Sequence, residues 1–68
     1  MKLLHIDRAY DKGGYWINPN LVIGVAECYI GHKNQGVVGT SVLVQGLNTI
    51  ETNESIESVI ERIENACN

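Results

Sequence analysis

The chain has 68 residues, of which 44% are hydrophobic and 19% charged, and its formal net charge is −3. This length allows one domain, residues 1–68, and so short a chain buries only about 60% of the surface that its unfolded form exposes. Such a core usually needs a disulfide, a metal or another copy of the chain. No apolar run approaches the roughly 20 residues of a membrane span. We expect no signal peptide, because Asp7 follows the N-terminal apolar residues before a long enough apolar region can form. We therefore expect a cytoplasmic protein without membrane insertion.

The basic residues argue against nucleic acid as a partner. Nucleic-acid binding draws on several phosphate contacts that are made together. The five basic residues are instead scattered along the chain, at Lys2, Arg8, Lys12, Lys33 and Arg62.

Apolar and turn patterns predict five strands, over residues 2–6, 15–18, 21–30, 40–44 and 47–51. Gly13-Gly14 permits the positive φ angles of a turn between the first two strands. Pro19 interrupts the ladder before the third strand, because proline has no N–H to donate. Loop 31–39 and a two-residue turn at Gln45-Gly46 separate the remaining strands.

The C-terminal segment predicts an amphipathic helix over residues 55–66. Apolar residues recur there at helical spacing, at Ile56, Val59, Ile60, Ile63 and Ala66. Asn53 or Ser55 can serve as the N-cap. The predicted fold is therefore α+β, a small and mostly antiparallel five-stranded meander with one C-terminal helix.

The third strand predicts a homo-oligomer. In a regular strand its apolar residues divide between both faces, with Leu21, Ile23 and Val25 on one side and Val22, Ala26, Cys28 and Ile30 on the other. One short helix covers only one face of a sheet. A second copy is the simplest cover for the other face or for an unpaired edge.

The cysteine and histidine residues do not predict a metal site or a redox site. Without an export signal, Cys28 and Cys67 are expected to be reduced thiols, and no CxxC motif is present. His5 and Asp7 share one face of a strand. A zinc site would also need Cys28 and His32 to converge from distant segments, so we favour a surface histidine beside a solvated aspartate.

Catalytic motifs are also missing from the sequence. No GxSxG nucleophile motif occurs, and the glycines match neither GxGxxG nor GxxxxGK[ST]. Glu57, Glu61 and Glu64 fall on the exposed side of the helix, where burial does not shift a pKa. We expect a protein that is not an enzyme and that has no cofactor and no metal.

The candidate interaction residues lie at the first turn and in the polar loop. Tyr15 and Trp16 alternate onto opposite faces of their strand, so at most one enters the core. The other is free to contact another copy, which we favour, or another protein, because aromatic residues are enriched in binding hot spots. Loop 31–39 is the second candidate surface. The six residues are Tyr10, Tyr15, Trp16, His32, Lys33 and Asn34.

The segment Ile17-Asn18-Pro19-Asn20 before Leu21, and Glu54-Ser55 before the helix, resemble the small FlbD/SwrD-type proteins of flagellar and swarming motility and comparable short phage proteins. This resemblance spans most of the chain and implies the fold more than the function. Loop 31–39 is longer than such a protein's hairpin needs, and the cysteines are additional.

These observations lead to one main hypothesis and one alternative. We expect a small, non-enzymatic, homo-oligomeric module that binds another protein, as a bacterial accessory or regulatory factor or a phage-encoded modulator. The alternative is a module for a small ligand or for nucleic acid, which would use the aromatic turn and loop 31–39.

Overall fold

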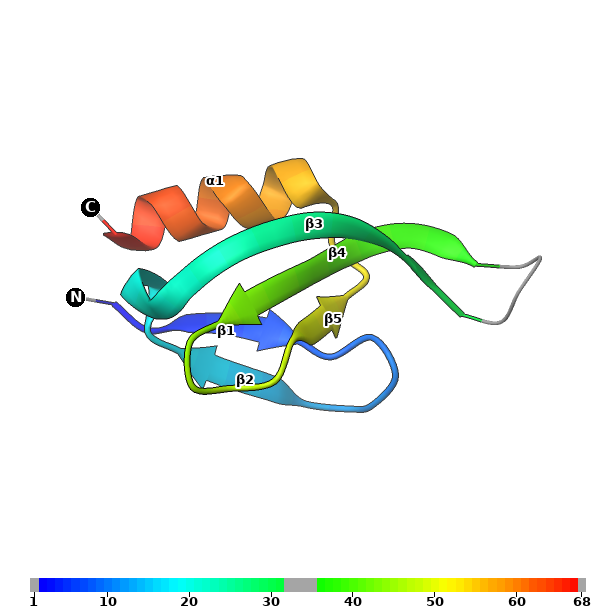
Figure 1. Cartoon of the computed structure of the whole chain (residues 1–68), viewed down its shortest axis with the longest axis horizontal. Helices are drawn as coiled ribbons and strands as arrows, with labels where there is room; N and C mark the ends of the chain where they lie inside the picture. The colour runs from blue at the N-terminus through cyan, green and yellow to red at the C-terminus, as the bar shows by residue number, and fades with distance from the viewer. Residues whose placement is uncertain (1, 32–35, 68) are drawn as a thin grey trace.

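The computed structural model describes residues 2–31 and 36–67 (Figure 1). The elements are β1 (Leu4–Asp7), β2 (Gly14–Ile17), the 3-10 helix η1 (Pro19–Leu21), β3 (Val22–Ile30), β4 (Val37–Val44), β5 (Ile50–Thr52) and α1 (Ile56–Cys67). The predicted α+β class, with five strands and one C-terminal helix, is confirmed. No helix in the described ranges combines the length and the apolar character that a membrane crossing requires.

The strands form two antiparallel sheets rather than one continuous meander. β1 pairs with β2, and β3, β4 and β5 pair in that order. The break lies at Asn18-Pro19-Asn20. Asn20 donates its backbone N–H to Asn18 Oδ1 at 2.9 Å, and Pro19 opens η1 because its fixed φ suits the first turn of a helix. The segment is therefore a capped helical turn that joins the two sheets.

Two of the predicted strand boundaries are wrong by three residues. β4 begins at Val37, inside the predicted loop 31–39, because residues 37–39 already pair with β3. β5 begins at Ile50 rather than at residue 47. Leu47 donates its backbone N–H to the Val44 carbonyl at 3.1 Å, so the residues expected to begin β5 still belong to the turn after β4. The returning chain first pairs with β4 at Ile50, opposite Val42.

The hydrophobic core lies between the two sheets and α1. Its buried members come from four strands and the helix and are Leu4, Ile6, Ile17, Val42, Val44, Ile50, Val59 and Ala66. Ser55 is the N-cap of α1, since its side-chain oxygen accepts the Ser58 backbone N–H at 3.2 Å.

A bulge changes the predicted faces of β3. Val22 pairs with Val44 and Gly24 with Leu43, so Ile23 is an extra residue in the ladder. An extra residue reverses the alternation beyond it. Val22 and Val25 consequently both pack against the core, whereas the sequence placed them on opposite faces.

The predicted apolar face of α1 is only partly buried. Val59 and Ala66 are buried, whereas Ile60 is 38% exposed. Arg62, which the sequence placed on the solvent side, instead bonds to Glu54 Oε1 and to the backbone carbonyl of His5. The helix is therefore turned so that one isoleucine remains at the surface.

The far ends of β3 and β4 extend beyond α1 (Figure 1). Tyr29 pairs there with Val38, and both side chains are exposed. The projecting hairpin thus carries apolar side chains that the helix does not reach.

Candidate functional site

The outer face of β1 and β2 carries the only tryptophan of the chain. Trp16 lies opposite His5 in the ladder, and their ring centroids are 4.9 Å apart. Trp16 is nevertheless 69% exposed. His5 Nδ1 lies 3.4 Å from Asp7 Oδ1, as their shared face predicts. We call this set of Trp16, His5 and Asp7 the Trp16 face.

Tyr15 points the other way, as the alternation predicts. It is half-buried and packs against the hydrophobic core. The guanidinium carbon of Arg8 lies 5.3 Å from the centre of the Tyr15 ring, a distance suited to a cation–π contact. Tyr15 therefore serves packing, and Trp16 is the aromatic that remains available at the surface.

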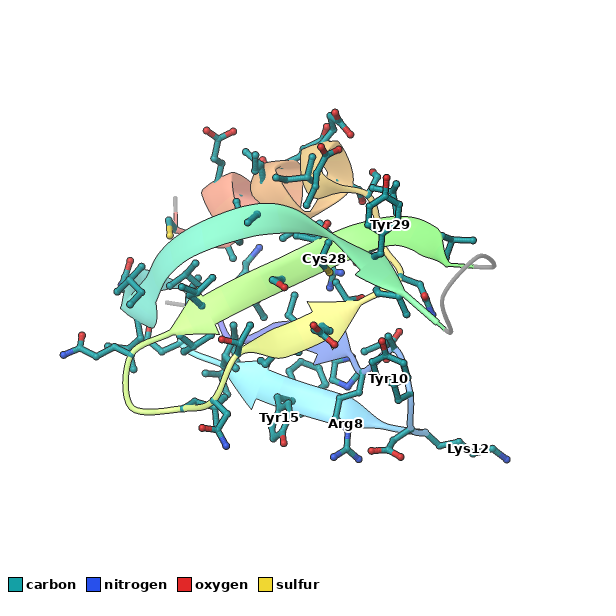
Figure 2. The ribbon with its side chains drawn as sticks, turned by 45° about the vertical axis from the view of Figure 1, so that its right-hand side comes forward. Arg8, Tyr10, Lys12, Tyr15, Cys28 and Tyr29 are labelled. Atoms are coloured by element: carbon teal, nitrogen blue, oxygen red, sulfur yellow. The ribbon has the colours of Figure 1, made fainter. Side chains whose placement is uncertain are left out.

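Tyr10 is exposed, but it does not join the Trp16 face. Its hydroxyl accepts the backbone N–H of Gly31 at 3.3 Å, so it connects the first turn to the end of β3. Figure 2 shows Tyr10 near Arg8, apart from Tyr29 on β3. The three predicted aromatics thus come from one hairpin and its turn but do not form one patch. His32, Lys33 and Asn34 lie outside the described residues.

An open cavity of about 210 Å³ lies beside this turn. Its lining includes Arg8, Tyr10 and Tyr15 together with two acidic residues, Asp11 and Glu51. Arg8 Nη1 lies 3.8 Å from Asp11 Oδ2, and the buried Arg8 Nε has no hydrogen-bond partner. The cavity therefore contains a guanidinium group with one nitrogen that has no hydrogen-bond partner, together with two aromatic side chains.

The groups with metal-binding or redox chemistry are dispersed. Cys28 is half-buried, Cys67 is exposed, and no disulfide joins them. In the part of the chain that the structure describes, no three His, Cys, Asp or Glu side chains converge as metal ligands. Among the basic residues that the structure describes, Arg8 and Arg62 have carboxylate neighbours.

A second apolar surface, absent from the candidates that the sequence named, lies along β3. Tyr29 is 78% exposed and Ile23 is 69% exposed. A groove of about 250 Å³ runs between the first half of β3 and α1 and is lined by Val22, Ile23, Gly24, Val25, Ile60, Ile63 and Glu64. The sequence did signal a two-faced apolar strand. The bulge and the projecting hairpin, which decide what is exposed, are not visible in an alternation pattern.

No family model, curated protein or solved structure matches the chain. The resemblance to FlbD/SwrD-type proteins therefore stays a prediction.

Proposed function

We propose that this chain is a small, non-enzymatic protein-interaction module that self-associates and binds another protein through the Trp16 face. The observation that carries the proposal is the 69% exposure of Trp16 in the middle of a regular strand. Tryptophan is mostly buried in folded proteins and is the residue type most enriched in binding hot spots.

The Trp16 face lies on strands whose inner side is packed into the core, which favours binding. Leu4, Ile6 and Ile17, on the inner side of the same two strands, are buried in the core. Trp16 therefore stands on backbone that is already ordered before a partner arrives. A preordered surface loses less conformational entropy on association.

We assign self-association and the binding of another protein to two separate surfaces. From the sequence, we favoured another copy of the chain as the contact of the outward aromatic. Within the described residues, one edge of β3 pairs with no strand. This edge is better suited to a second copy, because it adds main-chain hydrogen bonds to apolar contacts. We therefore assign the Trp16 face to a different protein. The proposal includes a cytoplasmic setting and a role as a bacterial accessory factor or phage-encoded modulator.

Affinity capture with a matched pair of variants tests the proposal. Trp16→Ala removes the central side chain, whereas Tyr10→Ala removes an exposed aromatic from the adjoining turn. We expect the wild type and Tyr10→Ala to retain the same specific protein and Trp16→Ala to lose it, with all three folded by circular dichroism. Retention of that protein by Trp16→Ala, or no specific protein with the wild type, would contradict the proposal.

A second candidate function, the binding of a small carboxylate ligand, is favoured by the unpartnered Arg8 Nε at the cavity beside the first turn. Asp11 and Glu51 line the same cavity and would repel an anion, so this function ranks second. A rise in the melting temperature with N-acetyl amino acids that Arg8→Gln abolishes would support it.

A further inference from the structure

β3 has an edge that no other strand covers. In the described ranges, β3 pairs with β4 and with no other strand. Its nine residues include a single charged one, Glu27, and neither lysine nor proline. Proteins usually protect such an edge with charges, proline, a bulge or a covering element. In β3 the bulge at Ile23 lies near one end, and residues 25–30 beyond it pair regularly with β4, so that part of the edge can accept another strand.

The groove lies beside this edge, on the side where β3 meets α1. Ile60 and Ile63 form its helical wall, and the residues around the bulge form the other. The exposure of Ile60 and Ile23 shows that no part of the described chain fills the groove. An added strand would therefore find main-chain groups along the edge and an apolar hollow next to it.

We propose that β3 pairs antiparallel with β3 of a second copy around a two-fold axis at Ala26, and that Tyr29 of each copy enters the groove between β3 and α1 of the other. This inference rests on the self-association in the proposed function and gives it a location and a register.

The register follows from the strand itself. Ala26 is the midpoint of Val22–Ile30, so an axis at Ala26 overlaps the whole strand. Tyr29 of one copy then reaches the bulge at Ile23 of the other, beside the groove that Ile23 lines. Contacts between aromatic and β-branched side chains on neighbouring strands stabilise a sheet. The pair joins two of the most exposed apolar side chains of the described chain.

The side of the sheet on which Tyr29 lies is also consistent with this pairing. Beyond the bulge, Val25, Glu27 and Tyr29 alternate onto one side, and Val25 packs there against the core under α1. A two-fold axis perpendicular to the sheet keeps this side the same in both copies. Tyr29 of the second copy is therefore brought to the side on which α1 and the groove lie.

A second copy fits this surface because the same patch supplies both a projecting side chain and a hollow. A two-fold interface requires such self-complementarity. A biological interface buries at least about 500 Å² per partner, roughly a tenth of the 4749 Å² that the chain exposes. A tyrosine alone can bury about 150–250 Å², so the strand edge and the groove residues need to supply only the remainder.

Cysteine cross-linking tests the register. In a background with Cys28→Ser and Cys67→Ser, Ala26→Cys places two thiols at the axis. The matched control is Ser41→Cys, which lies opposite Ala26 on β4, one strand farther from the axis. We expect oxidation or a short bismaleimide to link the Ala26→Cys copies and to leave the Ser41→Cys copies unlinked.

A second variant tests the contact with the groove. Tyr29→Lys changes an exposed side chain and should leave the fold intact, but it should raise the dimer dissociation constant by about thirtyfold or more, as for a hot-spot residue. This interface would be overturned if the wild type dimerises, Tyr29→Lys dimerises equally well, and the Ala26→Cys copies cross-link no better than the Ser41→Cys copies. That result would still agree with the proposed self-association. A wild type that stays monomeric would overturn both, whereas capture of another protein through Trp16 would be unaffected.

Discussion

The guanidinium of Arg62 donates a hydrogen bond to the backbone carbonyl of His5, although the two residues are 57 positions apart. The same side chain forms an ion pair with Glu54, just before the helix. Arg62 thus joins α1 to β1, the strand that contributes His5 and Asp7 to the Trp16 face. This polar contact adds to the apolar packing between the helix and the first sheet.

We therefore expect Arg62→Ala to lower the free energy of unfolding by about 1–2 kcal/mol, since hydrogen bonds to charged groups are among the stronger ones. Part of the side chain is exposed, which limits the effect. Urea denaturation measures it. Glu61→Ala, one residue away and exposed, is the control and should change stability by less than about 0.5 kcal/mol. Equal effects of the two substitutions would contradict the role assigned to Arg62.

Gly39 is required by close packing. A Cβ at this position would overlap the side chain of Ile30 and the backbone carbonyl of Thr52. We expect Gly39→Ala to destabilise the protein by about 1–3 kcal/mol, the usual cost of overpacking. Gly24→Ala is the control, because a Cβ there meets no atom within 4 Å. Thermal unfolding at low protein concentration should show a clear loss for the first variant and little change for the second.

Trp16 reports on its own surroundings, because it is the only tryptophan. If copies associate through β3, its emission maximum should stay at the long wavelength of an exposed indole over the whole range of concentration in which the dimer forms. If the Trp16 face joined the copies, the maximum would shift to shorter wavelength as concentration rises. Fluorescence during a dilution series therefore separates the two surfaces.

The salt dependence of binding distinguishes a second copy of the chain from a basic partner at the β3 edge. Each copy carries a net charge of −3, and the proposed pairing brings Glu27 of one copy towards the side of the other where Glu64 lines the groove. Salt screens this repulsion. We expect the dimer dissociation constant to fall modestly between low and high ionic strength. A marked rise would contradict the pairing of two acidic surfaces.

The sequence predicted the helix and the strands well, but it predicted the contacts and exposure of their side chains less well. The spacing of Val59, Ile63 and Ala66 identified the helix, and alternation correctly separated Tyr15 from Trp16, because both are local properties of regular backbone. The bulge at Ile23 is different, since an extra residue is detected only when the partner strand is known.

The same limit applies to the candidate site. Trp16 was identified from its residue type and position. Tyr29 was missed because its exposure depends on where α1 begins relative to the projecting hairpin, which is a tertiary relationship. Arg62 was placed in solvent for a similar reason, since the His5 carbonyl that it reaches lies at the opposite end of the chain.

Sedimentation of the wild type over a wide range of concentration tests the central claim, that the edge of β3 joins two copies. We predict that the mass rises from the 7.5 kDa of one chain to twice that value, and that Tyr29→Lys keeps it near the lower value while Trp16→Ala follows the wild type. A constant 7.5 kDa at every concentration, or a dimer lost in Trp16→Ala and kept in Tyr29→Lys, would contradict the claim.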